Sequence, residues 1–479
     1  MQRLVRTAAV LLPAAVAAVL FTAANAYANV ALTQVSSDPY ADTQAQHRTE
    51  VEPDTFSFGS TIVSAFQVGR VFGGGASNIG FATSSDGGTT WTRGFLPGIT
   101  TVGGGVYTRA SDAAVAFDAR HNVWLISSLA IRSSSVDVLT SRSTDGGHTW
   151  SRPVTTATGS LDKNWIVCDN TSTSPFYGHC YTEYDVTSSS DALRMRTSSD
   201  GGATWGPARA TGDGAHGLGG QPVVRPNGTV LVPYLSTNDQ IRSFRSVDGG
   251  ASWRSTVLVS PVSHHEAAGG LREGGLPTAE IDAAGTAYVA WSDCRFRSGC
   301  PSNDIVLARS TSETTWAAPV RVPIDATSST VDHLVPGLGV DRASSGSTAR
   351  IGLTYYFYPA ANCTASTCQL DVGFVSSTNG GTSWSAPTQV AGPMSLSWLP
   401  NTSQGRMFGD YISTSVRSGG RAYPIVAVAQ APSGSTFNLA MYVPTGGLPI
   451  TGGTVRATTS APGTTQVPES PPATRMTAR

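Results

Sequence analysis

The apolar residues of this chain fall in short runs that alternate with polar residues or are rich in β-branched side chains. Successive side chains of a strand point to opposite faces, so such runs predict strands and not helices. Paired runs recur along the whole chain, at residues 61–68, 113–117 with 123–129, 164–167 with 179–184, 222–224 with 230–234, 279–282 with 287–291, 338–340 with 351–356, and 411–416 with 425–429. The pattern predicts an all-β chain built from seven hairpin units, the last ending near Met441.

A turn motif, Ser-x-Asp-Gly-Gly-x-Thr-Trp, recurs between these runs. Full copies, the last with Ser for Thr, occupy residues 84–91, 143–150, 198–205 and 246–253. Two altered copies lie at 377–384, which has Asn379 for the Asp, and at 310–316, which is one residue shorter and lacks the glycines. The tryptophans are 59, 55, 48, 63 and 68 residues apart, a spacing that suits one four-stranded propeller blade per repeat.

Each residue of the motif has a structural reason. The two glycines permit the positive φ angles of a tight turn, and the Asp carboxylate and the hydroxyl groups can bond the amides of the same turn. The Trp has a large apolar area to bury against its own sheet or the neighbouring one. We therefore interpret the motif as structural. A calcium site at the Asp is not favoured, because the ligand pattern of an EF-hand is absent.

The motif resembles the Asp-box, or bacterial neuraminidase repeat, of the sialidase superfamily. The resemblance implies a β-propeller of four-stranded blades with Asp-box turns. It also implies six blades, whereas the seven hairpins predict seven, so we favour seven blades and keep six as the alternative. An isolated apolar run at residues 30–35 could complete the last blade and close the ring, which would leave no bare sheet edge.

The two ends of the chain differ from the repeats. Two arginines, an apolar run at residues 8–21 and small residues after it predict a secretory signal peptide over residues 1–28 and a secreted protein. We expect one propeller domain over 29–443 and a disordered tail over 444–479, where Gly, Pro, Ser and Thr dominate. Residues 448–452 spell the Leu-Pro-x-Thr-Gly signal for cell-wall attachment, but no apolar span follows them.

Charge and cysteine content restrict the partners. The net charge is −1, or −3 without the two arginines of the predicted signal, and this argues against nucleic acid as a partner. Six cysteines in an exported protein indicate disulfides, and although other pairings stay open, we favour the local pairs Cys168–Cys180, Cys294–Cys300 and Cys363–Cys368. We expect no metal, no cofactor and no membrane span, and we expect a monomer.

Ligands of propellers bind at the mouth of the central channel, where the innermost strands begin. Tyr411, preceded by Asp410, opens such a strand, and its surroundings resemble those of the sialidase nucleophile. Asp162 and Lys163 precede another inner strand, and Lys163 is the only lysine in the chain. This pair could face a ligand or form a surface salt bridge. Further charged candidates are Glu266, Glu280, Asp332, Arg70, Arg295 and Arg406.

The resemblance also implies a mechanism. Sialidases hold the substrate carboxylate with three arginines, activate a Tyr nucleophile through a Glu, and protonate the leaving group with an Asp. Under this scheme Tyr411 is the nucleophile, Glu266 or Glu280 its base, and Asp162 the acid, with Asp410 beside the nucleophile. The predicted substrate-binding residues are Arg406, Arg295, Arg70, Lys163 and Asp332.

One departure from the family leaves the function open. The Arg-Ile-Pro motif that supplies a clamp arginine is missing before the first box, and residues 321–323, Arg-Val-Pro, follow the fifth box instead. Three functions therefore compete. The first is a secreted sialidase-like glycoside hydrolase acting on terminal acidic sugars, the second is a non-catalytic propeller that binds glycans or another surface, and the third is a polysaccharide hydrolase that uses two carboxylates.

Overall fold

The structure is a computed structural model that describes residues 30–459, and within this range the chain is nearly all-β. The prediction of an all-β chain is confirmed. Its helices are short 3-10 turns, namely η1 (Thr101–Gly103), η2 (Thr187–Ser189), η3 (Ala268–Gly270), η4 (Gly346–Thr348) and η5 (Leu396–Trp398). Across residues 30–459 no helix has the length and apolar character needed to cross a membrane. The predicted signal peptide lies outside the described residues.

Consecutive antiparallel strands form groups that we number as units 1 to 7. Unit 1 contains β2 (Ala45–Phe58), β3 (Thr61–Val71), β4 (Ala76–Ser84) and β5 (Thr92–Phe95). Unit 2 contains β6 (Arg109–Asp118), β7 (Val123–Ile131), β8 (Val136–Ser143) and β9 (Val154–Ala157). Unit 3 contains β10 (Leu161–Cys168), β11 (Cys180–Val186) and β12 (Ala192–Ser198), and a single bridge from β12 to Arg209 stands in place of its outer strand.

The remaining units follow the same order along the chain. Unit 4 contains β13 (Gly217–Leu218), β14 (Val223–Val224), β15 (Val230–Ser236), β16 (Gln240–Ser246) and β17 (Val257–Pro261). Unit 5 contains β18 (Thr278–Ile281), β19 (Ala287–Asp293), β20 (Asp304–Ser310) and β21 (Val320–Arg321). Unit 6 contains β22 (Asp332–Val340), β23 (Ile351–Tyr358), β24 (Gln369–Ser377) and β26 (Thr388–Ser395), and unit 7 contains β29 (Ser413–Arg417), β30 (Arg421–Ala429) and β31 (Leu439–Pro444).

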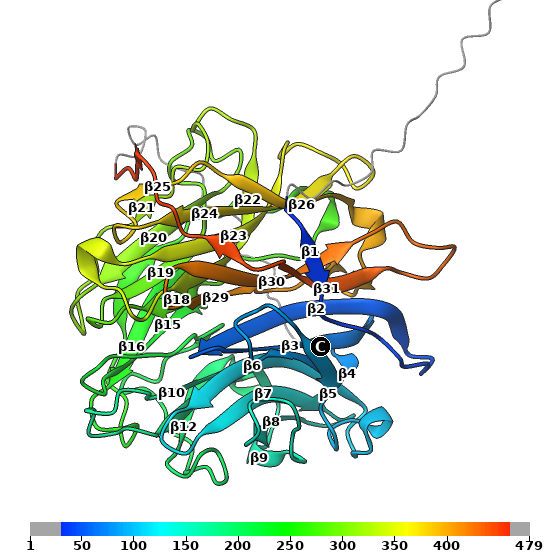
Figure 1. The fold of residues 1–479 in the computed structure, drawn as a ribbon, viewed down its shortest axis with the longest axis vertical. Coiled ribbons are helices and arrows are strands. Elements are labelled where there is room, and N and C mark those ends of the chain that lie inside the picture. Colours follow the sequence, from blue (N-terminus) through cyan, green and yellow to red (C-terminus); the bar gives the residue numbers. More distant parts are fainter. Residues whose placement is uncertain (1–29, 460–479) are drawn as a thin grey trace, which may run out of the picture.

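The first strands of the units contact one another in chain order. In unit 4 the first strand is interrupted, since β13 and β14 both pair with β15. β2 lies against β6, β6 against β10, β10 against β14, β14 against β18, β18 against β22, and β22 against β29. β29 in turn lies against β2, so the cycle of contacts returns to its start. Figure 1 shows the same order, because the colours follow one another around the molecule from blue β2 to orange β30. The first strands therefore surround a common axis.

The N-terminal strand completes unit 7. β1 (Leu32–Gln34) pairs with β31 in the antiparallel sense, and the amide of Val35 donates to the carbonyl of Met441 over 2.9 Å. Blue β1 accordingly lies beside β31 in Figure 1. The apolar run at residues 30–35 was predicted to close the last unit, and the pairing confirms this. Closure covers the edge of β31, which would otherwise offer unpaired backbone groups to another chain.

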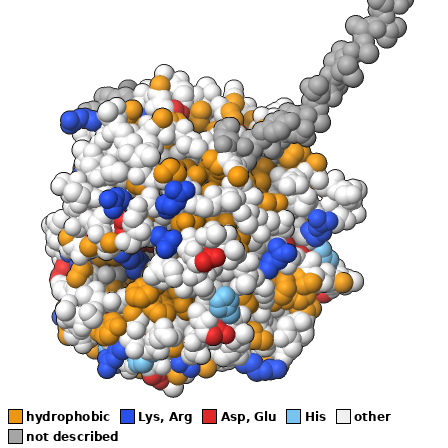
Figure 2. Space-filling model, viewed as in Figure 1, with side chains coloured by type: hydrophobic (Ala, Val, Ile, Leu, Met, Phe, Trp, Pro, Cys, Tyr) orange, Lys and Arg blue, Asp and Glu red, His pale blue; other side chains and the backbone are white. Residues whose placement is uncertain are grey.

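The core lies between neighbouring units and not within a single sheet. One buried apolar cluster joins units 1 and 2, where Val63 and Ile79 meet Val115 and Ile126. Similar clusters join units 4 and 5 and units 5 and 6. Most side chains on the face shown in Figure 2 are uncharged, as the 13% content of charged residues leads us to expect.

The Asp-box turns also connect the units. In the second box the side chain of Asp145 accepts bonds from the amides of His148 and Thr149, and Trp150 is 8% exposed. The carbonyl group of a box glycine accepts a side-chain bond from the preceding unit in several boxes, with the pairs Thr83–Gly147, Arg142–Gly201, Arg309–Gly380 and Arg417–Gly87. The boxes are thus structural, and they link each sheet to the next.

Residues 444–459, which the composition assigned to a disordered tail, instead contain two strands that pair with earlier strands of the chain. β32 (Leu448–Pro449) pairs with β30, and β33 (Val455–Arg456) pairs with β25 (Ser383–Trp384). Leu448 and Ile450 are buried, and their apolar side chains give the segment a reason to pack. The Leu-Pro-x-Thr-Gly sequence lies within this packed segment. Residues 460–479 lie outside the described range.

The cysteines form the three local disulfides that the sequence favoured: Cys168–Cys180, Cys294–Cys300 and Cys363–Cys368. Each spans a loop between two paired strands of one unit, joining β10 to β11, β19 to β20 and β23 to β24. They therefore pin hairpins within a unit and do not cross between units.

Candidate functional site

An identical irregularity occurs in the first strand of four units. In β2, β6, β10 and β22 one extra residue is inserted opposite the second strand, which makes a β-bulge. The inserted residues have positive φ angles although none is glycine, and they are Glu52, Asp112, Lys163 and Val335. Such backbone is costly for residues with a Cβ, and bulges often redirect a side chain next to a functional site. Three of the four are charged, and they meet near the axis.

Lys163 lies at the centre of this axial cluster. Its Nζ atom lies 2.5 Å from the Asp410 carboxylate, 3.4 Å from that of Asp112 and 3.9 Å from that of Glu52. All four side chains are almost fully buried. Asp112 and Asp410 raise the pKa of Lys163 despite its burial, so the lysine stays charged. The Asp162–Lys163 pair of the sequence prediction is therefore buried and does not form a surface salt bridge.

Two arginines extend the axial cluster. Arg272 is 3% exposed, and its Nε and Nη2 atoms both bond the Asp410 carboxylate, through Nε at 2.7 Å. Arg70 is 1% exposed and donates through Nη1 to Gln67, which in turn donates to Glu52. Among the described residues, Nε and Nη2 of Arg70 and Nη1 of Arg272 have no hydrogen-bond partner. Buried guanidinium N–H groups without a partner are unusual, and they could bind an anion.

The electrostatics of the axial cluster separate its carboxyl groups. Burial raises the pKa of Asp410, but Arg272 and Lys163 outweigh it and hold the pKa well below its usual range. Burial, together with Asp410 and Asp112, raises the pKa of Glu52. A carboxylate and a carboxyl group that tends to keep its proton therefore lie next to each other, which is a common arrangement in acid–base sites.

Tyr411 lines a narrow cavity beside this cluster, together with Asp112, Lys163 and Trp165. Its hydroxyl group donates to the carbonyl of Ala113 over 3.2 Å, and its ring meets that of Trp165 edge to face. Burial raises the pKa of Tyr411 well above its usual value, and Glu52 and Asp112 add to the effect. The phenol is therefore neutral as it stands.

The structure brings together five residues that the sequence singled out, namely Tyr411, Asp410, Asp162, Lys163 and Arg70. Asp162 lies on β10 next to Lys163, whose amide it accepts over 3.0 Å. Glu266 is exposed on the segment between β17 and β18. Glu280 lines a different cavity and pairs with Arg342 at 3.2 Å. Neither glutamate lines the cavity that holds Tyr411.

The other substrate-binding candidates have separate partners. Arg295 forms an ion pair with Asp293 at 2.6 Å, and Asp332 bonds His265 and the amide of Asn303. Arg406 donates to the carbonyl of Leu399, while its own carbonyl accepts the amide of Arg272 over 2.7 Å. Arg406 therefore contacts the axial cluster through its backbone. The three arginines that the sequence analysis expected to bind the substrate carboxylate, Arg406, Arg295 and Arg70, do not come together in one site.

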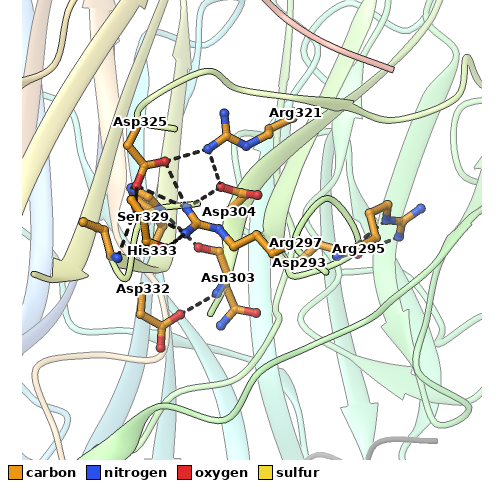
Figure 3. Close-up of polar contacts among 11 residues, drawn as sticks. Asp293, Arg295, Arg297, Asn303, Asp304, Arg321, Asp325, Ser329, Asp332 and His333 are labelled. Atoms are coloured by element: carbon orange, nitrogen blue, oxygen red, sulfur yellow. Dashed lines mark hydrogen bonds and ion pairs between the residues drawn. The ribbon is translucent and has the colours of Figure 1, made fainter. Parts of the chain in front are cut away.

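A second buried polar cluster lies in units 5 and 6 (Figure 3). Asp304, Asp325 and His333 lie close enough to share a metal ion. However, Arg297 and Arg321 both contact Asp304 and Asp325, at distances from 2.6 to 2.9 Å. Two guanidinium groups already neutralise the acidic oxygens, so these residues do not fit a metal ion.

The sequence did not identify Glu52, Asp112 and Arg272 as site residues. Glu52 and Asp112 reach the axis through bulges. Asp112 precedes an apolar run in β6, but β2 contains so many polar residues that Glu52 does not stand out in it. Arg272 comes from the segment between β17 and β18, whose course no periodicity predicts.

No protein-family model and no curated protein matches the chain. Several solved structures are similar to it. A protein of unknown function from Dyadobacter fermentans is 16% identical, with a TM-score of 0.46 over 72% of this chain and 98% of the other. The intramolecular trans-sialidase of a leech is 14% identical, with a TM-score of 0.42 over 86% and 69%. An α-L-arabinofuranosidase from Fusarium graminearum is 13% identical, with a TM-score of 0.44 over 73% and 98%. Likeness at this level assigns neither a family nor a residue role to the chain.

Proposed function

We propose that the seven units are the blades of one β-propeller and that its ligand site is the axial cluster. The cyclic contacts of the first strands support seven blades over six, because each of the seven units contributes a strand to the cycle. The closure of unit 7 by β1 supports a ring without a free edge.

We further propose that the protein is a secreted, monomeric glycoside hydrolase of the sialidase type, which acts on a terminal acidic sugar. One observation supports this above the others. A tyrosine, carboxyl groups in different protonation states, and guanidinium groups with unpartnered N–H atoms occur in one buried cluster. Arg70 and Arg272 would hold the carboxylate of the sugar.

In this mechanism the Tyr411 hydroxyl oxygen attacks the anomeric carbon and its proton passes to the carboxylate of Asp112, which lines the same cavity. Glu52, whose raised pKa keeps it protonated, donates its proton to the departing oxygen as the glycosidic bond breaks. A water molecule then releases the sugar: Glu52 accepts a proton from the water, and Asp112 returns its proton to the Tyr411 oxygen. The raised pKa of Tyr411 fits a neutral phenol, which approaches an anionic sugar more readily than a phenolate would. Asp112 thus takes the role of the base that the sequence gave to Glu266 or Glu280, and Glu52 takes the role of the acid that it gave to Asp162.

A non-catalytic carbohydrate-binding propeller is the second candidate, and one observation favours it. Lys163 and Arg272 are already paired with Asp410, and both are at most 4% exposed. Charges that already neutralise one another suit a structural ion-pair network, and in that case a carbohydrate would bind elsewhere on the propeller.

Turnover of a fluorogenic sialoside and of neutral glycosides by the secreted protein tests the proposal. We expect cleavage of the sialoside, and we expect Tyr411→Phe to reduce kcat at least about a thousandfold, because the nucleophile is lost. Tyr442→Phe is the matched control, since Tyr442 lies on β31 and keeps no contact with the cluster. Thermal unfolding of both variants checks that each is folded.

Three outcomes would contradict the proposal. An inactive wild-type protein that still binds sialosides favours the non-catalytic propeller. Full activity in Tyr411→Phe excludes the tyrosine as nucleophile. Cleavage of neutral polysaccharides that is lost in Asp112→Asn but kept in Tyr411→Phe favours a hydrolase that uses two carboxylates.

A further inference from the structure

A second cavity, of about 420 Å³, opens where the first strands end. Residues that terminate β2, β10, β18, β22 and β29 line it, whereas the axial cluster is built from earlier positions on β2, β6 and β10. The two sites therefore lie toward opposite ends of the axis. The volume of this cavity is within the usual range for small-molecule sites.

We call this second cavity the lower cavity. An aromatic ring lies at its rim. Phe58, the last residue of β2, lines the cavity and is 43% exposed, which is unusual for so large an apolar side chain. Its ring centroid lies 4.5 Å from that of Phe117, which in turn lies 4.8 Å from that of Trp124. These contacts fix the ring, so a ligand that stacks on Phe58 would not have to order it.

A charged pair lies on the wall of the same cavity. The Nη2 atom of Arg342 lies 3.2 Å from a carboxylate oxygen of Glu280, and its guanidinium group stacks 4.6 Å over the ring of Phe56. The side chains of Glu280 and Arg342 are 19% and 35% exposed. The pair is therefore held in place on one side and keeps donor and acceptor atoms open to the cavity.

The other charged side chains that line the cavity already have hydrogen-bond partners. Asp282 accepts bonds from turn amides, and Asp341 bonds Arg350 and a turn amide. Arg417 donates to the carbonyl groups of Gly59 and Gly87. The lining carries three carboxylates, Glu280, Asp282 and Asp341, against the two arginines Arg342 and Arg417, and this excess of negative charge disfavours an anion. Adjacent donors and acceptors beside an apolar ring instead suit the hydroxyl groups and the apolar face of a neutral sugar.

We propose that the lower cavity binds a neutral pyranose sugar, whose C–H face stacks on Phe58 while its hydroxyl groups bridge Glu280 and Arg342. This site goes beyond the proposed hydrolase function, which concerns an acidic sugar at the other end of the axis. Glu280, which the sequence assigned to catalysis, has a binding role in this proposal.

Saturation-transfer NMR and calorimetry on the full secreted chain test the site, with glucose, galactose, mannose, N-acetylglucosamine and N-acetylneuraminic acid as probes. We expect at least one neutral sugar to bind. Phe58→Ala and Glu280→Gln should each weaken its binding about tenfold or more. Phe72→Ala is the matched control, because Phe72 is 53% exposed at the opposite end of β3, and it should change the affinity by less than about twofold.

Tyr411→Phe separates this proposal from the proposed hydrolase. Binding of the neutral sugar should persist in Tyr411→Phe, whether or not the wild-type protein hydrolyses sialosides. The proposal is overturned if no neutral sugar binds, if only N-acetylneuraminic acid binds, or if Phe58→Ala binds the sugar as well as Phe72→Ala does. Loss of neutral-sugar binding in Tyr411→Phe would place the ligand at the axial cluster and would also overturn it.

Discussion

Asp410 is a buried carboxylate that two buried cations share. Lys163 and Arg272 both contact it, and neither side chain is more than about 4% exposed. A buried ion pair adds little net stability, because the desolvation of both charges offsets their attraction. Removing one partner is different, since the remaining charge stays buried without compensation. The axial cluster is therefore sensitive to changes at this one position.

We predict that Asp410→Asn lowers the free energy of unfolding by about 3 to 5 kcal/mol, because Arg272 loses its ion-pair partner and Lys163 loses the nearest of its three carboxylates. Guanidinium chloride unfolding at neutral pH measures the loss. Glu313→Gln is the control, since Glu313 pairs with Arg245 on the surface, at 3.3 Å. Its loss should stay below about 1 kcal/mol. Equal losses in the two variants would show that the buried pairing does not matter.

Sequence reasoning located part of this cluster. Tyr411 and Lys163 could be singled out, because the start of an inner strand is a known place for ligand contacts in propellers. Arg70, near the end of β3, was singled out only because the resemblance implies substrate-binding arginines. Glu52 and Asp112 could not be, since their positions depend on positive φ angles that their residue types do not predict. A bulge arises from long-range strand pairing, and a local pattern does not encode it.

The Ser-x-Asp-Gly-Gly-x-Thr-Trp turn is the element that the sequence predicted best, because the hydrogen bonds that shape the turn lie within eight residues. The altered box at 377–384 shows which feature matters. Asn379 accepts the amide of Ser383 over 2.9 Å and donates to the Ser383 hydroxyl, so the turn survives without a charge. An acceptor oxygen at this position is therefore required, and a negative charge is not. The packed segment 444–459 escaped prediction, since its contacts come from distant strands.

We predict that Asp145→Ala lowers the free energy of unfolding by about 1 to 2 kcal/mol, while Asp145→Asn costs less than about half of that. Alanine leaves the amides of His148 and Thr149 and the Thr149 hydroxyl without their acceptor, whereas asparagine keeps an oxygen in place. Urea unfolding of the two variants at pH 7 is the measurement. Equal losses would mean that the charge itself stabilises the turn.

At the scale of the whole molecule, β2 joins three units through buried carboxyl groups. Glu50 accepts the hydroxyl of Ser36, whose oxygen also accepts the amide of Met441 in unit 7. Asp54 accepts the amide of Val115 in unit 2 over 2.6 Å. Burial raises the pKa of Glu50 to about 8 and that of Asp54 to about 7. The protonation of carboxyl groups on β2 is therefore linked to the contact between β1 and β31, through Ser36 and Met441.

These shifts predict how stability depends on pH. A carboxyl group whose pKa is higher in the folded state binds more protons when folded, so its contribution is complete below the unfolded pKa near 4 and is lost as pH rises toward 7 or 8. Asp410 acts in the opposite sense, because its lowered pKa makes stability fall in more acidic solution. We therefore expect the free energy of unfolding to be highest near about pH 4 and to decline above it by on the order of 1.4 kcal/mol per pH unit for each of the two groups, until the folded pKa of that group is passed. Urea unfolding at steps of half a pH unit measures this profile.

Glu50→Gln is the control variant, because glutamine keeps an acceptor for Ser36 but cannot ionise. Its free energy of unfolding should therefore decline less steeply from pH 5 to 8 than that of the wild-type protein. A stability that rises over this range, or a Glu50→Gln profile parallel to the wild type, would show that Glu50 does not contribute to the pH dependence of stability.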